Sequence, residues 1–368
     1  MTTTIFLIIF GFIVVMESAI PFLLRRTIAF GVTIPEGHTD DRVVASYKKM
    51  YSIIISSIGL ISLFGFAIWA NSNTITEEQI VLIGLAIQFG ILFLSMALYL
   101  YFHAKTTQLK RVNNWGADLK QIRIVDLAIR TKDEMLPTSI FALPMAITIG
   151  LIAYTATQYG NMPDMIPTHW GPSGQPDAFS PKTPFSVIAL LLIQLIMQGM
   201  LFGFNALIKR SGIKLNAAKS KSSQIQQLSF RKYSSWFFFM TTVLSTILMS
   251  FLHLSTIHAG IGNTVLMLAM PLGFLLLILI GTAVYAFKVG QSGSRIDVAF
   301  EDETTPGVTD VDDDQHWKFG VFYVNKNDPS IFVEKRFGVG WTVNFGQPLG
   351  YIILFGPLVL ISVIAFLL

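Results

Sequence analysis

The sequence lacks cysteine altogether, and only 13% of its 368 residues are charged. The missing cysteines exclude disulfide bonds, a thiol nucleophile and cysteine-ligated metal sites. The charged fraction is about half of the roughly 25% that is usual in soluble domains. Runs of alternating apolar and polar residues are also missing, which argues against a lipid-facing β-barrel. No HExxH motif occurs, so a zinc protease of that type is not supported.

Long apolar stretches are what the sequence does contain. Hydrophobic residues make up 52% of the chain, and its mean hydropathy is +0.60. A bilayer core about 30 Å thick needs about 20 apolar residues in a helix. Eight stretches satisfy this length: 5–24, 50–70, 80–102, 137–156, 184–208, 236–254, 264–287 and 349–368. The sequence therefore predicts an all-α membrane protein with about eight transmembrane helices. Because Arg25 and Arg26 follow the first stretch and none precedes it, we expect a mature helix and not a signal peptide.

Lysine and arginine occur almost only in alternate connections. Residues 25–49, 103–136, 209–235 and 288–348 hold all but one of the 26, and the exception is Lys182. Connections rich in these residues stay in the cytoplasm, which predicts a multi-pass cell-membrane protein with both termini outside. The basic loops would lie near anionic lipid headgroups, so the net charge of +4 needs no nucleic-acid partner. The lipid bilayer is the expected partner, and no direct nucleic-acid contact is expected.

These patterns divide the chain into five regions. They are a three-helix membrane region (1–136), a helix–loop–helix unit (137–208), two further helices with a basic loop (209–288), an acidic linker with an aromatic module (289–348) and the last helix (349–368).

Two cytoplasmic segments carry local patterns of their own. Within 103–136, the apolar residues Leu119, Ile122, Val125 and Ile129 recur at helical spacing. They predict an amphipathic helix on the membrane or a solvated connecting helix. From Asp297 to Gln315 there are eight acidic residues and no Lys or Arg, which is typical of a disordered linker.

Metals and cofactors are not expected. Asp310, Asp312 and Asp314 have the spacing of a calcium loop, but Gln315 and Val321 stand where that loop needs Gly and Glu. A lone histidine near a membrane interface, such as His253, is more often structural than a ligand.

The segment before the last helix is rich in aromatic and β-branched residues. Residues 317–324 and 330–333 are β-prone, and 325–329 supply turn residues, which predicts a small cytoplasmic β-hairpin. Its role is an aromatic anchor at the bilayer surface or a docking surface for a cytoplasmic partner. The candidates for docking are Trp317, Tyr323, Asn325, Asp328, Arg336 and Trp341.

Inside the predicted spans, Glu17 is the one acidic residue well within an apolar stretch. Such a carboxylate faces a bundle interior or cavity, and a functional role such as proton coupling is the default hypothesis. The alternative is a structural role, with hydrogen bonds to Ser18 or to a neighbouring helix. Gln194 and Gln198 are four residues apart on one helix face and, like Gln88 and Asn205, are typical of amides that join helices.

The connection 157–183 is the most informative region for function. Five prolines restrict its backbone, and it contains a donor, an acceptor and a cation in His169, Asp177 and Lys182. The alternative is an ordinary solvated surface loop.

This loop resembles that of the SdpI-type family of bacterial membrane proteins, whose signature Pro-x-His…Gly-x-x-Asp…Lys lies between two helices. The matching positions are Pro167, His169, Gly174, Asp177 and Lys182. The resemblance implies immunity to a secreted toxic peptide, combined with signalling to a cytoplasmic regulator. The stretch from Trp317 to Asn344 resembles a second bacterial domain of unknown function. This chain departs from the SdpI-type pattern in its eight spans and its extra module.

Three functions compete. The preferred hypothesis is a non-enzymatic bacterial protein that senses, or gives immunity to, a membrane-active peptide. The alternatives are a secondary transporter that uses Glu17, and a membrane enzyme in which His169 acts as a base oriented by Asp177. No nucleophile motif supports the enzyme, so no catalytic residue is predicted.

Overall fold

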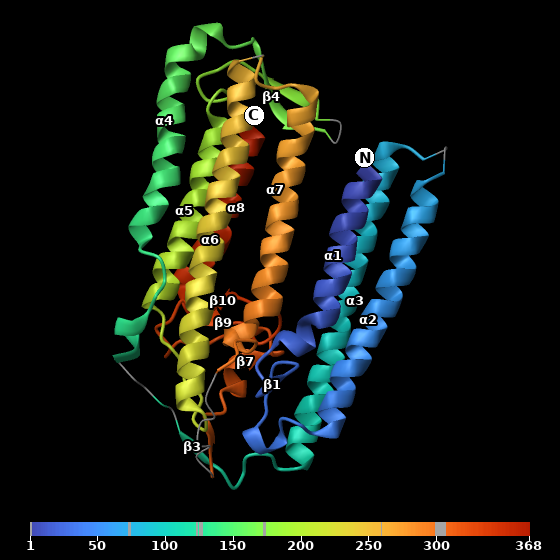
Figure 1. The fold of residues 1–368 in the computed structure, drawn as a ribbon, viewed down its shortest axis with the longest axis vertical. Helices are drawn as coiled ribbons and strands as arrows, with labels where there is room; N and C mark the ends of the chain where they lie inside the picture. Colours follow the sequence, from blue (N-terminus) through green and yellow to red (C-terminus); the bar gives the residue numbers. More distant parts are fainter. Residues whose placement is uncertain are drawn as a thin grey trace. The chain divides into compact units, whose positions relative to one another are not determined.

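The structure is a computed structural model that describes residues 2–368 except 73–74, 123, 125–127, 172–173, 259 and 299–306. The described residues form eight helices long and apolar enough to cross a membrane, as predicted (Figure 1). The helices are α1 (Thr2–Leu23), α2 (Arg42–Ala70), α3 (Glu77–Val112), α4 (Ala142–Gln158), α5 (Ala189–Arg210), α6 (Ser220–Ile257), α7 (Thr264–Val284) and α8 (Pro348–Leu367). Short 3₁₀ turns occupy Glu36–His38, Ala128–Lys132, Thr138–Phe141, Tyr159–Asn161, Gln291–Gly293 and Asp314–His316, and a π-helical turn occupies Tyr285–Val289.

Several helices extend beyond the apolar stretches that predicted them. The α2 helix begins at Arg42 because the Asp41 side chain caps it, accepting hydrogen bonds from the backbone N–H groups of Val43 and Val44. The α3 helix begins after Thr76, which forms a capping box with Gln79. Hydropathy detects only the lipid-spanning part of a helix, so these polar extensions were not predicted.

The chain folds as two compact units. Unit 1 comprises Met1–Asp133, Gly212–Phe230 and Ala283–Gly346, and unit 2 comprises Glu134–Ser211, Arg231–Thr282 and Gln347–Leu368. In unit 1, α1, α2 and α3 pack together as a three-helix bundle. Gly59 on α2 and Gly84 on α3 allow close packing, since a methyl group there would come within 2.6 Å of Val14 and 2.5 Å of Phe6.

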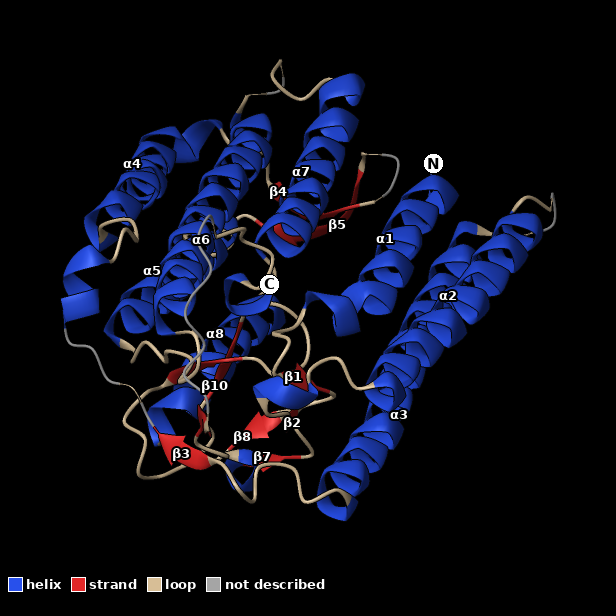
Figure 2. Ribbon diagram, turned by 60° about the horizontal axis from the view of Figure 1, so that its bottom comes forward, coloured by secondary structure: helices blue, strands red, loops and turns tan. Residues whose placement is uncertain are grey.

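The described residues of unit 1 also form four short two-stranded sheets (Figure 2). Three are antiparallel hairpins: β1 (Ile28–Ala29) with β2 (Val32–Thr33), β7 (Trp317–Lys318) with β8 (Phe322–Tyr323), and β9 (Phe332–Glu334) with β10 (Trp341–Val343). Residues 25–41 and 307–346, which carry these hairpins, are called the hairpin module below.

The predicted hairpin before the last helix is therefore two hairpins with a different pairing. The first turns at Phe319-Gly320, inside the stretch predicted as one strand, and 325–329 connect the two hairpins. Three residues, 319–321, lie between the paired positions Lys318 and Phe322, and the chain reverses there because Phe319 and Gly320 both adopt positive φ.

The amphipathic helix predicted within 103–136 is wrong for the described residues. The β3 strand (Lys120–Ile122) pairs in parallel with β6 (Val308–Asp310), and the backbone groups of 120–122 are satisfied by this distant segment instead of by a helix. Val125 lies outside the described residues. Within the acidic stretch, Val308–Asp310 form a strand and Asp314–His316 a 3₁₀ turn, which differs from the predicted disordered linker; Glu301, Asp302 and Glu303 lie outside the described residues.

In unit 2, α5 packs against α4 and α8. The buried face of α5 carries Gln194, Gln198 and Asn205. Gln198 donates hydrogen bonds to the Pro144 carbonyl (3.0 Å) and to Thr148 and Thr246, and Asn205 accepts one from Ser235. These amides join α5 to α4 and α6, as their spacing predicted. The connection between α4 and α5 forms a hairpin of β4 (Met165–Trp170) and β5 (Pro176–Pro181) at one end of these helices (Figure 1).

Candidate functional site

The β4–β5 hairpin holds the residues of the predicted signature. Its antiparallel register runs from Met165 opposite Pro181 to Trp170 opposite Pro176, and it shifts on either side of His169. The hairpin is fixed to the helices below it. Ile166 belongs to a buried cluster with Val187 and Ile257, and a methyl group on Gly174 would come within 2.9 Å of Leu268 on α7. These contacts fix the two strands of the hairpin to the ends of the helices.

His169 and Asp177 face each other across the two strands. The His169 Nδ1 atom lies 2.5 Å from Asp177 Oδ1, and the two side chains are 66% and 51% exposed. Gly171 leaves room for the carboxylate, because a methyl group there would come within 2.8 Å of Asp177 Oδ2. The pair therefore presents an oriented carboxylate and an imidazole on an exposed surface.

Lys182 does not join this pair. Its ammonium group donates to the Met162 carbonyl oxygen (2.8 Å), lies 3.6 Å from Asp164 Oδ1 and sits over the Tyr159 ring. The backbone N–H of Lys182 also donates to the Asp164 carbonyl. Lys182 thus fixes the base of the hairpin to the end of α4. The five signature residues divide into an exposed pair and positions that shape the loop.

A pocket lies beside β4 in unit 2. Apolar side chains form most of its lining, including Trp170, Leu190 and Ile193, and the polar residues His253 and Thr256 also line it. His253 Nε2 lies 2.7 Å from the Thr155 hydroxyl on α4. Pro167 belongs to the same lining, so the pocket and the exposed pair share strand β4.

Glu17 lies in the three-helix bundle of unit 1. Its Oε2 atom accepts a hydrogen bond from Ser95 on α3, and the Ser95 hydroxyl lies 2.6 Å from the Tyr51 hydroxyl on α2. The carboxylate is therefore hydrogen-bonded to a neighbouring helix, as one of the two predicted roles requires. Lys335 of the hairpin module lies within electrostatic range of this carboxylate.

Two residues of the acidic stretch, Asp313 and Asp314, pair with Arg336. This guanidinium, 7% exposed, donates to Asp313, Asp314 and the Gly31 carbonyl (2.7 Å). Lys110 at the end of α3 reaches Asp314 (2.7 Å) as well. Burial by itself would raise the pKa of Asp314, but the two cations outweigh burial and lower that pKa to about 2.

The other docking candidates also pack within unit 1. The Arg336 guanidinium lies over the Trp317 ring (5.0 Å), and Trp341 stacks on Phe230 (5.4 Å). The Tyr323 hydroxyl donates to Asp328 Oδ2 (2.9 Å). Asn325 Nδ2 donates to the Tyr323 hydroxyl (3.1 Å). These side chains hold the module together, and their pairing explains the aromatic and polar pattern of the sequence.

Asn344 is a central residue of the module that was not among the predicted docking candidates. It is fully buried and donates to the carbonyl oxygens of Asn325, Asp328 and Ser330. Its own amide oxygen accepts from the backbone N–H groups of Asn325 and Gly346. A buried amide with every hydrogen bond satisfied fixes one loop conformation.

The hairpin module also contains a recurring tripeptide that hydropathy and charge patterns do not reveal. Phe-Gly-Val occurs at residues 30–32, 319–321 and 337–339, once in each hairpin of the module. A methyl group on Gly31 would come within 2.7 Å of Gly320 Cα and 2.3 Å of the Tyr99 hydroxyl, and the Phe337 ring lies 4.0 Å from the Tyr99 ring. The three turns therefore meet at Tyr99, one helical turn from Ser95. A search for internal repeats would have found this signal.

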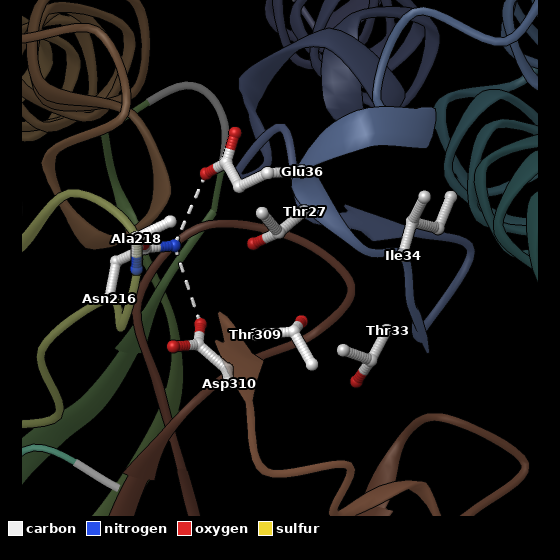
Figure 3. Close-up of a pocket in the computed structure, with 8 residues that line it drawn as sticks. All are labelled: Thr27, Thr33, Ile34, Glu36, Asn216, Ala218, Thr309 and Asp310. Carbon is white, nitrogen blue, oxygen red and sulfur yellow. Dashed lines mark hydrogen bonds between the residues drawn. The ribbon is translucent and has the colours of Figure 1, made fainter. Parts of the chain in front are cut away.

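A small polar pocket lies between the segments that follow α1, precede α6 and contain β6 (Figure 3). Asn216 Nδ2 donates to Glu36 Oε1 (3.2 Å) and Asp310 Oδ2 (3.4 Å), and the Ala217 N–H donates to Asp310 Oδ1 (2.6 Å). Burial raises the pKa of Asp310. Within the described part of the chain, no three His, Cys, Asp or Glu residues are placed to hold a metal. The amide occupies the space between the two carboxylates, so this arrangement joins chain segments.

Two family models match parts of this chain. One describes a domain of unknown function (DUF1648) and matches residues 146–195, and the other describes a family of unknown function (DUF5808) and matches residues 326–351. No curated protein and no solved structure matches. The first match covers most of α4, the β4–β5 hairpin and the start of α5. The second covers β9, β10 and Asn344. The chain is thus a membrane protein that carries two domains of unknown function.

Proposed function

We propose that this chain is a bacterial cell-membrane protein that recognises a membrane-active peptide through the β4–β5 hairpin. The observation that carries the proposal is the exposed His169–Asp177 pair on a hairpin fixed at its base and beside an apolar pocket. The SdpI-type resemblance of the same residues supports this reading. The lysine-poor connection 157–183 would face outward and meet a secreted peptide there.

The chemistry of the surface defines the peptide. The Asp177 carboxylate would attract an ammonium or guanidinium group, and a charge-assisted hydrogen bond contributes about 1.5–3 kcal/mol. The pocket beside β4 would take an apolar side chain. Met165 and Phe179 are exposed on the same hairpin and add apolar contact. A cationic amphipathic peptide combines these features, as many membrane-active peptides do.

The proposed signal would pass to the opposite side of the membrane. The basic connections and the hairpin module would face the cytoplasm, where a regulator would bind. This part of the proposal rests on the charge asymmetry of the loops and on the SdpI-type resemblance.

The test uses cells that express the full chain and a synthetic amphipathic peptide built from lysine and leucine. We expect the parent chain to protect the cells, and Asp177→Asn or His169→Ala to weaken peptide binding roughly tenfold. Thr157→Ala, an exposed change near the end of α4, is the matched control. Equal protection by all variants at equal membrane levels would refute the proposal.

A further inference from the structure

Two of the Phe-Gly-Val turns place a phenylalanine in the left-handed backbone region. Phe30 has φ 46° and Phe319 has φ 55°. For a bulky side chain this conformation is a genuine outlier that costs on the order of 1–3 kcal/mol. A protein retains such a strained residue where surrounding interactions compensate for the strain energy.

The two residues differ in what offsets this cost. Phe30 is 2% exposed and packs against Phe102 (5.2 Å), Tyr51 (5.8 Å) and Tyr99 (6.3 Å). Phe319 is 67% exposed, so burial within the chain does not offset its strain. The same turn therefore has a buried aromatic ring in one hairpin and an exposed one in the other.

The same hairpin carries a second exposed aromatic ring, which packs against a half-buried one. In β8, Tyr323 faces the interior while Phe322 is 47% exposed. The Phe322 ring packs edge-on against Phe345 (5.6 Å). Phe319, Phe322 and Phe345 are called the aromatic edge below.

Two markers place the aromatic edge at the level of the bilayer surface. The turn of Phe319 rests on α3, where a methyl group on Gly320 would come within 2.4 Å of the Tyr99 hydroxyl and 3.0 Å of His103 Nδ1. There the apolar part of α3 ends, with Tyr101 exposed and Lys105 following. Phe345 is three residues before Pro348, the first residue of the apolar helix α8, so it lies within about 11 Å of it.

We infer that the aromatic edge inserts into the headgroup region of the adjacent bilayer leaflet and prefers anionic lipid. Exposed aromatic rings at this level gain free energy from the interface. Lys318 is exposed next to Phe319, and Lys105 is exposed two residues beyond His103, which complements anionic headgroups. Insertion would offset the strain at Phe319 and hold the hairpin module against the membrane.

The absence of cysteine makes a direct test practical. Single-cysteine variants Phe319→Cys and Phe322→Cys of the full chain carry a spin label and are reconstituted into vesicles of phosphatidylcholine with phosphatidylglycerol. Asn327→Cys, exposed in the loop after β8, is the matched control. We expect the labels at 319 and 322 to collide several-fold more often with oxygen than with a water-soluble nickel chelate, and the label at 327 to show the reverse.

Each contrary outcome is distinct. If the nickel chelate reaches the label at 319 as freely as the label at 327, the aromatic edge does not insert. If both reagents are excluded from 319 and 322, a protein contact covers the edge and the inference is overturned. In pure phosphatidylcholine vesicles, the ratio of oxygen collisions to nickel-chelate collisions at 319 and 322 should fall at least twofold. An unchanged ratio would overturn the preference for anionic lipid.

Discussion

Replacing the phenylalanine with glycine should destabilise the protein in one Phe-Gly-Val turn and leave its stability unchanged or slightly raised in another. The variants are Phe30→Gly in the β1–β2 turn and Phe319→Gly in the β7–β8 turn. Both changes remove a side chain from a positive-φ position that glycine adopts without strain. The backbone effect is therefore shared, and the difference reports how each ring is packed.

The magnitudes follow from burial. Removing the Phe30 ring from its aromatic cluster lowers the free energy of unfolding by about 3–5 kcal/mol, and release of the backbone strain raises it by about 1 kcal/mol. We expect Phe30→Gly to destabilise unit 1 by about 3 kcal/mol. Phe319 is mostly exposed, so its removal loses little burial, and strain release exceeds the entropic cost of glycine, which is about 0.5–1 kcal/mol. We expect a change between zero and about 1 kcal/mol in the stabilising direction.

The assay is thermal unfolding of the purified chain in detergent, followed by circular dichroism or by protease resistance. Phe30→Gly should lower the midpoint by several degrees, while Phe319→Gly should leave it unchanged or raise it. If both variants lower the midpoint equally, the packing difference between the two turns does not exist in solution, and the inference about Phe319 loses its first premise.

Three further predictions concern polar groups. Arg336→Lys should destabilise the chain by about 3 kcal/mol, because an ammonium group cannot donate to Asp313, Asp314 and the Gly31 carbonyl together. Thermal unfolding tests this, and the exposed substitution Lys318→Arg is the control. The lowered pKa of Asp314 contributes about 2 kcal/mol to the free energy of unfolding. This contribution is present above a pH of about 4 and is lost as the pH falls towards 2. Between these pH values, the unfolding midpoint should therefore drop less steeply in Asp314→Asn than in the parent chain. Gln198→Met should lower the free energy of unfolding by less than about 1 kcal/mol, since Thr148 and Thr246 keep their hydrogen bonds to backbone carbonyls. A loss of more than about 2 kcal/mol in thermal unfolding would contradict this.

The candidate site was partly predictable from local sequence. His169 and Asp177 were selected as donor and acceptor, and the structure pairs them across a hairpin. The separation of Lys182 from that pair was not predictable, because it depends on where the end of α4 places the Met162 carbonyl. Sequence spacing shows which groups are near in the chain, whereas a strand register decides which ones meet.

The hairpin module shows the opposite case. The sequence pattern predicts its aromatic residues as a docking surface, and the structure shows that Trp317 lies against Arg336, Tyr323 bonds to Asp328 and Trp341 stacks on Phe230. Arg336 bonds to the Gly31 carbonyl, 305 residues earlier in the sequence. The apolar spacing around Ile122 predicted a helix, but pairing with β6 satisfies that backbone instead. Long-range partners of this kind leave no periodic signal.

The sequence by itself determined eight helices that are long and apolar enough to cross a membrane, because each span is a local property of about 20 consecutive residues and needs no partner. Charge in alternate loops likewise predicted an orientation from composition alone. Only the tertiary structure decided that three Phe-Gly-Val turns meet at Tyr99 and that Asp314 is held by Arg336 and Lys110. Those contacts join segments far apart in the chain, and their geometry arises when the hairpins pack on the ends of the helices.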